Sequence, residues 1–477
     1  MKRGSIFRTI KRDYALHLFL VIGIALVVNG IIFIPLKHST DALKHSTGTS
    51  SQTATTSLVN WVTYMWNPER SGYNSKETII NPSSASHLKI HWKYAAKGSI
   101  NTEPVVFNGA IYWGAWDGYE RAMNLSGTML WQTYLGKVSP AGCDPKSAGV
   151  ASTATVATVS IGGVLTSVVL VGGGNARFYA LNATTGHIIW STQLGTSPTN
   201  MIWDSPAFYN GSVYIGTSSY GDCPQVHGQI FRLDATTGTI QNTFTSPCGG
   251  GGVWGSLTID EPYNTIYAAT GNGNCNTGFA LLKLSATNLS LISSWQVPSN
   301  ERTGDDDFGT APSVFPATIN NVVRQLVGVE NKSGTYFALD RANLSAGPVW
   351  KARLSTDVGG NHSTSGWDNR TLYIGSAATS INGKACGGSI RAMNPATGGY
   401  LWQYCASGKV AGAVMLVPGL VIAGAGSSLV VLNAQSGQQL FSYQDIASSS
   451  FFWGTASVSD GVLYIGNKDG QIYAFGL

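Results

Sequence analysis

The sequence predicts an all-β fold, an eight-bladed β-propeller, and two observations support this prediction. A motif of strand, Gly turn and strand ending in tryptophan recurs along the chain, for example as Ala-Leu-Asn-Ala-Thr-Thr-Gly-His-Ile-Ile-Trp over residues 180–190. Short strands repeated at a period of tens of residues are typical of propellers. The chain also has 58 Gly and 14 Trp in 477 residues and only 11% charged residues, which suits a large β domain with many tight turns.

Eight aromatic residues mark the expected outer strands of the blades, namely Trp92, Trp131, Trp190, Phe244, Trp295, Trp350, Trp402 and Phe441. An indole in such a strand can fill the wedge between two blades while its N–H reaches a backbone carbonyl. The strand around Trp92 lacks the strands that should precede it, and residues 450–477 lack an outer strand. We therefore expect the first strand to complete the last blade, which would leave no open sheet edge there.

The first 60 residues differ from the rest in composition. Residues 1–14 are basic, residues 15–36 are almost wholly apolar, and residues 37–60 are rich in Ser and Thr. A membrane-spanning helix requires roughly 20 apolar residues, and a basic segment before it indicates a cytoplasmic N-terminus. We expect a basic cytoplasmic segment, a single-pass signal anchor in the cell membrane, a flexible linker, and a propeller of residues 61–477 on the extracytoplasmic side. A cleaved signal peptide is the alternative.

The charge distribution excludes a nucleic-acid partner. The net charge is +5, but five basic residues and one acidic residue lie before residue 37, so the remainder is nearly neutral. Nucleic-acid-binding domains instead carry a basic patch or stripe.

The cysteines predict disulfides. No two of the six cysteines form a Cys-x-x-Cys motif, which disfavours a zinc knuckle or an attached c-type haem. All six follow the predicted anchor, on the side of the membrane where disulfides persist. Cys248 with Cys275, and Cys386 with Cys405, are local pairs within one blade or at its boundary, and we expect both to form.

Four motifs carry a resemblance to a known family. They are Gly-Val-Trp-Gly-Ser at 252–256, Ala-Thr-Gly-Asn at 269–272, Asp-Asp-Asp-Phe-Gly at 305–309, and Glu-Asn-Lys-Ser-Gly-Thr-Tyr-Phe-Ala-Leu-Asp-Arg at 330–341. Together with the repeats, they resemble the tryptophan-docked, eight-bladed propellers of quinoprotein alcohol dehydrogenases, which use pyrroloquinoline quinone (PQQ). The polyvinyl-alcohol dehydrogenase branch is the most similar.

The resemblance implies a site. Trp254 would be the floor on which the quinone stacks, and Lys332 would contact the quinone oxygens. Asp307, with Asp305 as the alternative, would be the catalytic carboxylate that accepts the alcohol proton while hydride moves to the quinone. Asn272 and Asp307 would be ligands of Ca²⁺, which takes oxygen ligands. Each residue also has a structural interpretation: an indole packed between blades, an Asn in a turn, a solvated acidic loop, and a lysine in a surface turn.

The sequence also departs from the family pattern. Cys223 stands where the family's calcium-ligating glutamate is expected, and Ala148 stands near the place of an arginine. The resemblance puts Cys143 and Cys223 on the inner face of the second and third blades. There they can reach the Cα separation that a disulfide requires, so we expect a Cys143–Cys223 bridge at the mouth of the channel. The absence of a haem motif implies a separate electron acceptor.

Three functions remain open on the sequence, one of which is a purely structural surface protein. The first is a membrane-anchored, PQQ-dependent dehydrogenase of a small or polymeric alcohol. The second is a non-catalytic propeller that binds a protein or glycan, because similar repeats also occur in propellers without a quinone and fold alone does not fix function.

Overall fold

The computed structural model describes residues 58–302, 304–447 and 450–477. The predicted signal anchor and most of the predicted linker lie outside these residues. Within the described residues, no helix is both long and apolar enough to cross a membrane. Ser57–Leu477 form one compact unit.

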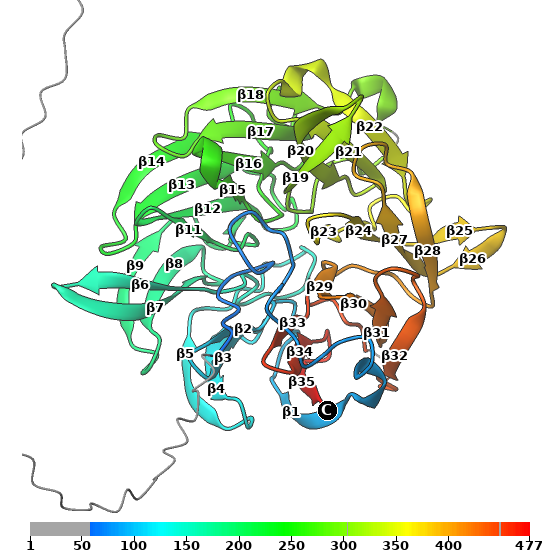
Figure 1. The fold of residues 1–477 in the computed structure, drawn as a ribbon. Coiled ribbons are helices and arrows are strands. Elements are labelled where there is room, and N and C mark those ends of the chain that lie inside the picture. The colour runs from blue at the N-terminus through cyan, green and yellow to red at the C-terminus, as the bar shows by residue number, and fades with distance from the viewer. Residues whose placement is uncertain (1–57, 303, 448–449) are drawn as a thin grey trace, which may run out of the picture. The chain divides into compact units, whose positions relative to one another are not determined.

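Eight antiparallel sheets follow one another around a ring, and each sheet is one blade (Figure 1). Blade 1 comprises β2 (Val105–Phe107), β3 (Ala110–Gly114), β4 (Tyr119–Asn124) and β5 (Met129–Tyr134), and blade 2 comprises β6 (Thr155–Ile161), β7 (Val164–Gly172), β8 (Arg177–Asn182) and β9 (Ile188–Gln193). Blade 3 comprises β10 (Asn200–Met201), β11 (Ala207–Tyr209), β12 (Ser212–Ser219), β13 (Gln229–Asp234) and β14 (Ile240–Thr245). Blade 4 comprises β15 (Thr258–Asp260), β16 (Thr265–Ala269), β17 (Ala280–Ser285) and β18 (Leu291–Gln296). Blade 3 holds the additional strand β10, which pairs with β12.

Blade 5 comprises β19 (Ser313–Ile319), β20 (Val322–Glu330), β21 (Thr335–Asp340) and β22 (Pro348–Arg353), and blade 6 comprises β23 (Gly366–Trp367), β24 (Leu372–Ser376), β27 (Gly388–Met393) and β28 (Tyr400–Ala406). Blade 7 comprises β29 (Met415–Val417), β30 (Leu420–Ala425), β31 (Ser428–Asn433) and β32 (Gln439–Gln444). Blade 8 comprises β33 (Ser457–Ser459), β34 (Val462–Gly466), β35 (Gln471–Gly476) and β1 (Lys89–Ala95). A hairpin of β25 (Thr379–Ile381) and β26 (Lys384–Cys386) extends from blade 6. The short 3₁₀ turns are η1 (Ala85–His87), η2 (Glu261–Tyr263), η3 (Ser299–Glu301) and η4 (Leu344–Ala346).

The ring closes as the sequence predicted. β1 pairs antiparallel with β35, and Trp92 lies opposite Ala474. The first ordered strand therefore completes the last blade, so the eighth sheet has its outer strand and the blade count of eight is confirmed.

The predicted aromatic residues lie on the outermost strands and hold neighbouring blades together. Trp131 of β5 donates its indole N–H to the carbonyl of Ala183 in blade 2 at 2.9 Å. Its ring packs on Gly186, which has a φ of +71° and where a Cβ would come within 2.6 Å of the indole. Glycine is therefore required at this turn by both its backbone conformation and the close approach. The same docking recurs at Trp92, Trp190, Trp350 and Trp402.

A segment before the first strand, residues 61–74, crosses the inner ends of the blades; Figure 1 shows it in blue at the centre of the ring. We call it the plug. Trp61 pairs with Val106 of blade 1, and Tyr73 pairs with Leu416 of blade 7. Arg70 is fully buried. Its guanidinium donates to carbonyls of blades 3 and 4 and of the plug itself. The plug therefore ties together blades from around the ring.

The chain enters the ring on one defined face. The amide of Val59 donates to the carboxylate of Asp460, and the amide of Asn108 donates to the side chain of Asn60 at 2.9 Å. Asp460 and Asn108 lie in the turns between the first and second strands of blades 8 and 1. Val59 and Asn60, which we had placed in the linker, thus already bond to the propeller.

Candidate active site

The central channel contains a cavity of about 640 Å³. Its walls come from the loops that precede the first strand of each blade and from the loops that join second and third strands. Because strands alternate in direction, these loops lie at the opposite end of the channel from the turns that contact Val59 and Asn60. The cavity therefore opens on the face opposite the one where the chain enters.

The floor of the cavity is polar. A ring of five hydroxyls, which we call the hydroxyl ring, is formed by Thr153, Ser205, Ser256, Thr364 and Thr455. Each of these hydroxyls accepts a backbone N–H from the preceding blade at 2.8–3.1 Å. Tyr64 of the plug also lines the cavity, and its hydroxyl donates to Thr364 at 3.1 Å. The plug thus closes the channel beneath the hydroxyl ring.

Aromatic side chains form much of the wall, which we call the aromatic wall. Trp254 stacks on Trp203 with 6.0 Å between ring centroids and 26° between planes. Trp116 lies 5.9 Å from Trp203 and 6.4 Å from Trp453. His362 lies 6.4 Å from Trp453. Burial, with help from Lys409 and Lys332, lowers the pKa of His362 to about 3, so its ring is neutral.

Sequence reasoning found Trp254 but missed the rest of the aromatic wall. Trp203, His362 and Trp453 occupy the same position as Trp254 in their own blades, two residues before the hydroxyl ring position. Aligning the repeats at the start of each inner strand would have identified them. The full set of equivalent cavity residues is Asn101, Ala151, Trp203, Trp254, Gly309, His362, Ala411 and Trp453.

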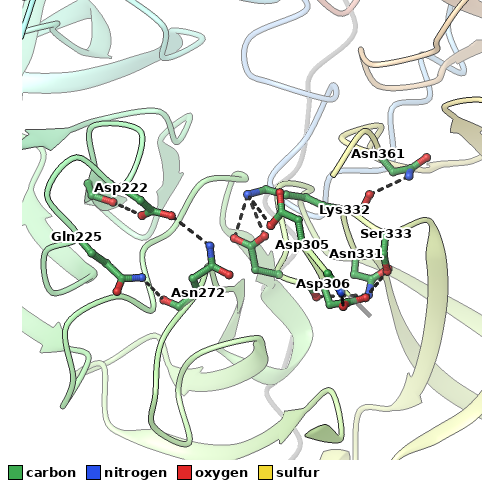
Figure 2. A network of polar contacts seen from close by, with 12 residues as sticks. Asp222, Gln225, Asn272, Asp305, Asp306, Asn331, Lys332, Ser333 and Asn361 are labelled. Atoms are coloured by element: carbon green, nitrogen blue, oxygen red, sulfur yellow. Dashed lines mark hydrogen bonds and ion pairs between the residues drawn. The ribbon is translucent and has the colours of Figure 1, made fainter. Parts of the chain in front are cut away.

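Three of the predicted site residues join Trp254 on one side of this wall. Asp305 and Asp307 lie in the loop before β19, and Lys332 lies in the loop between β20 and β21. The ammonium of Lys332 is 2.9 Å from Asp307 Oδ1. It is 3.7 Å from Asp305 Oδ1, and Figure 2 shows Lys332 beside Asp305. It also lies 5.3 Å from the centroid of the Trp254 ring. The structure therefore brings together the predicted cofactor floor, lysine and carboxylates.

The two carboxylates differ in environment. The Asp307 side chain is 0% exposed and does not line the cavity, whereas the Asp305 side chain is 42% exposed and does. Burial raises the pKa of Asp307 to about 8, against the opposing effect of Lys332. The pKa of Asp305 is lowered: burial would raise it, but the hydrogen bond with Asp307 and the charge of Lys332 outweigh burial. The cluster thus holds its negative charge on Asp305, the carboxylate that reaches the cavity.

Asn272, the other predicted calcium ligand, is not part of this cluster. Its amide donates to Asp222 Oδ2 at 3.1 Å, as Figure 2 shows, and Asn272 does not line the cavity. Asp222, beside the cysteine that replaces the expected glutamate, does line it. In the described part of the chain, no group of three or more His, Cys, Asp or Glu side chains is placed to hold a metal ion. The calcium prediction therefore gains no support from the structure.

All three predicted disulfides are present. Cys248 pairs with Cys275, and Cys386 pairs with Cys405. Cys143 pairs with Cys223 with a Cα separation of 5.7 Å. The neighbours Asp144 and Asp222 line the cavity, so this bridge lies at its mouth, as predicted.

Comparison with known proteins places these features in a family. The chain is 21% identical to the polyvinylalcohol dehydrogenase of Sphingopyxis sp. (strain 113P3) over 75% of its own length and 63% of that protein. It is 26% identical to the quinohemoprotein alcohol dehydrogenase of Comamonas testosteroni over 63% of its length and 46% of that protein. The chain thus spans less than two thirds of either relative.

Solved structures share the fold. The crystal structure of the Comamonas testosteroni quinohemoprotein alcohol dehydrogenase superposes with a TM-score of 0.72 at 17% identity, covering 87% of this chain and 80% of that one. BamB from Moraxella catarrhalis superposes with a TM-score of 0.54 at 14% identity, covering 82% of this chain and 100% of that one.

The family PQQ_2, described as outer membrane protein assembly factor BamB, matches residues 151–275 and 332–477. This match covers more than half of the chain and includes Trp254 and Lys332. With its eight blades, five of them docked by an outer-strand tryptophan, and its similarity to quinoprotein dehydrogenases, the chain belongs to this family of PQQ-type β-propellers.

Proposed function

We propose that the chain is an oxidoreductase that oxidises an alcohol in the central cavity with PQQ as the hydride acceptor. The observation that carries the proposal is the assembly of Trp254, Asp305, Asp307 and Lys332 on one side of that cavity. The names of the curated relatives, polyvinylalcohol dehydrogenase and quinohemoprotein alcohol dehydrogenase, support the same reaction class.

The residues present fit a flat quinone. Gly271 packs directly against Trp254, since a Cβ there would come within 2.4 Å of the indole nitrogen. The absence of a side chain at this position therefore allows the indole to occupy its place in the cavity wall. Lys332 stands over the ring of Trp254, where it can donate to the oxygens of a molecule stacked on the indole. Trp254 and Lys332 would hold the cofactor, and the quinone would supply a two-electron acceptor when bound.

Calcium does not fit the same residues as they stand. The ammonium of Lys332 lies within 3.0 Å of both carboxylate oxygens of Asp307, which is where a cation would have to bind. Asn272 is engaged with Asp222, away from Asp307. We therefore assign no step to a metal ion.

Asp305 and Asp307 would handle the alcohol proton as a pair. Asp305 reaches the cavity and carries the negative charge, so it can accept the proton of a bound hydroxyl. Asp307 lies behind it and fixes Lys332 in place. The hydroxyl ring below can hydrogen-bond a polar substrate, and the aromatic wall can pack against its carbon chain. Because the plug closes the other end of the channel, a polymeric alcohol would approach only from the mouth.

The propeller would be held outside the cell by the apolar segment of residues 15–36. Support comes from the largely apolar composition of that segment and from the basic residues before it. Protease added to intact cells should cut between residues 37 and 57 and release a folded propeller. A chain protected until the cells are lysed would contradict this placement.

An electron acceptor separate from this chain would complete the cycle, because the sequence has no haem-attachment motif. The competing function is a non-catalytic scaffold for a protein or glycan. The Cys143–Cys223 bridge, which stands in place of the family's ligand glutamate, favours that alternative.

Titration with PQQ distinguishes the two functions. We expect PQQ to quench tryptophan fluorescence, to raise the melting temperature, and to support dye reduction with an alcohol. Trp254→Ala should weaken cofactor binding, and Asp305→Asn should lower kcat by at least ~100-fold, the usual contribution of a general base. Glu301→Gln, which removes an exposed acid outside the cavity, is the control. Saturating PQQ without any of these effects would favour the scaffold.

The pH profile identifies which carboxylate is the base. A base acts when deprotonated, so activity that depends on Asp305, whose pKa is lowered, should already be high at pH 6. Activity that depends on Asp307 should rise through about pH 8. We expect the first profile, because Asp305 is the carboxylate on the cavity.

A further inference from the structure

A second cavity, of about 340 Å³, lies between blades 5 and 6, away from the central channel. Arg353, at the end of β22, and Arg391, in β27, contribute to its walls. The β25–β26 hairpin covers one side of it; Figure 1 shows this hairpin projecting from the ring. The hairpin is fixed to β28 by the Cys386–Cys405 disulfide, so this wall of the cavity is anchored covalently.

Neither of the two arginines forms an ion pair within the described part of the chain. None of the ion pairs found among the described residues involves Arg353 or Arg391. Arg391 is only 3% exposed, and it donates to neutral acceptors, Gln403 at 3.0 Å and Thr379 at 3.2 Å. A buried guanidinium without an anion retains its charge, because arginine stays protonated in proteins. Positive charge is therefore left uncompensated at this cavity.

Glu330 is the one acid whose charge acts on both arginines, and it is poorly placed to neutralise them. It is fully buried, and neither of its carboxylate oxygens has a hydrogen-bond partner in the described structure. Burial raises the pKa of Glu330 well above its usual value, against the effects of Arg391 and Arg353. Burial therefore opposes the charged form of this acid, and Glu330 forms no ion pair with either arginine among the described residues.

The remaining walls are rich in hydrogen-bonding groups and carry one aromatic face. The polar side chains of the lining include Ser355, Thr356, Ser380 and Asn382. The ring of Tyr400 lies 5.0 Å from the guanidinium of Arg391, and its hydroxyl donates to the carbonyl of Arg353 at 2.8 Å. Hydroxyls, amides and an aromatic ring suit a hydroxylated ligand, and guanidinium groups that line the same cavity suit phosphate or carboxylate.

We propose that this cavity binds a sugar-sized anion, in which a phosphate or carboxylate group contacts Arg353 and Arg391 and hydroxyls of the same molecule contact the hairpin side. The volume is at the lower end of the range for small-molecule sites, about 300–1,000 Å³, which matches a single sugar ring rather than a polymer. This inference is independent of PQQ and of the reaction proposed above.

Calorimetry on the purified full chain at constant ionic strength tests the proposal with four probes: glucose 6-phosphate, glucuronate, inorganic phosphate and glucose. We expect at least one of the two sugar anions to bind, inorganic phosphate to bind more weakly than the sugar anion, and glucose not to bind. If no anion binds, the site does not exist. If phosphate binds as tightly as the sugar anions, or if glucose binds equally well, the assignment to an anionic sugar is wrong.

Variants locate the binding. Arg353 is exposed, so Arg353→Gln should fold normally and weaken binding about tenfold, as expected for one charge-assisted contact. Arg324→Gln, which removes another exposed arginine of blade 5, should change nothing. Arg391→Lys keeps the charge but loses the planar fork, and it should also weaken binding provided that its melting temperature is unchanged. Equal weakening by Arg324→Gln, or none by Arg353→Gln, would overturn the proposal.

Discussion

The outer rim of the propeller, formed by the outermost strands, and its axis, which holds the central cavity, differ in how similar the residues of the eight repeats are. At the rim, an outer-strand tryptophan packs on a glycine turn of the next blade, and five of the eight blades show the same indole-to-carbonyl bond. At the axis, the equivalent cavity positions carry different residues: Asn101, Ala151, Trp203, Trp254, Gly309, His362, Ala411 and Trp453. The same backbone thus presents one recurring packing arrangement outside and five different residue types at the eight equivalent positions inside.

The difference reflects what each position has to do. A rim residue fills the same wedge between blades each time, so the same pair of an indole and a glycine serves repeatedly. A cavity residue faces open space, where packing does not constrain its type and chemistry does. In a repeat protein of this kind, departures from the repeat mark the functional surface better than the repeat itself.

The largest expected effect on stability concerns Arg70. This residue belongs to the plug at the axis, which is not part of any repeat. Its guanidinium donates to the backbone carbonyls of Tyr64, Ser205, Pro206 and Leu257, and it is fully buried. Each buried acceptor left unsatisfied costs ~1–3 kcal/mol, so Arg70→Ala should lower the free energy of unfolding by about 4 kcal/mol or more. Urea unfolding measures this.

Arg370→Ala is the matched control, because Arg370 is exposed on the same chain and should have an effect close to zero. If Arg70→Ala is as mild as the control, the plug does not hold the blades together. Loss of folding in Arg70→Ala would agree with the prediction. Arg70→Lys, which keeps some of the hydrogen-bond donors, should then have a stability between that of Arg70→Ala and that of the unmodified chain.

The next largest effect concerns a position at the rim where the repeat is not kept, because Phe244 replaces the outer-strand tryptophan. In the next blade, Leu289 occupies the place that Gly238 holds relative to Trp190, and it adopts a φ of +61°. Phe244 and Leu289 pack in the same apolar cluster. The smaller aromatic ring is therefore matched to the larger turn residue.

Phe244→Trp alone should be destabilising by about 2 kcal/mol, because the indole would collide with Leu289. Adding Leu289→Gly should restore stability, since glycine removes the collision and adopts positive φ without strain. A double-mutant cycle measured by urea unfolding should give a coupling energy of at least ~1 kcal/mol. Additive effects would show that the two positions are independent.

The rim was predictable from the sequence because its packing is local and repeated. The spacing of Trp131, Trp190 and Trp350 indicated the blades, and the complementary ends indicated ring closure by the strand that holds Trp92. The plug was not predictable. Arg70 donates to Ser205 and Leu257, each more than 130 positions away, and nothing in its neighbourhood in the sequence indicates these bonds.

The site was predictable in part. Motifs identified Trp254, Asp307 and Lys332, which do meet. They did not show that Lys332 would pair with Asp307, or that Asn272 would turn towards Asp222, because both contacts depend on how separate loops pack against each other. Such contacts are set by three-dimensional packing and leave no periodic signal.

The smallest expected effect concerns the pH dependence of stability and again separates axis from rim. Glu103, a buried residue next to the plug, accepts the N–H of Met65 at 3.1 Å, and burial raises its pKa to about 8. In the unfolded chain a glutamate titrates near ~4.3, so between these values the folded state holds a proton that the unfolded state has released. Stability must therefore fall as pH rises through this window.

Glu103→Gln cannot lose a proton, and its stability relative to the unmodified chain should increase by about 1 kcal/mol from pH 6 to pH 7. Glu301→Gln, which changes an exposed acid, should give a curve parallel to that of the unmodified chain. A parallel curve for Glu103→Gln would mean that Glu103 is already ionised in the folded state, held by the positive charge of Arg70, whose field acts on this carboxyl.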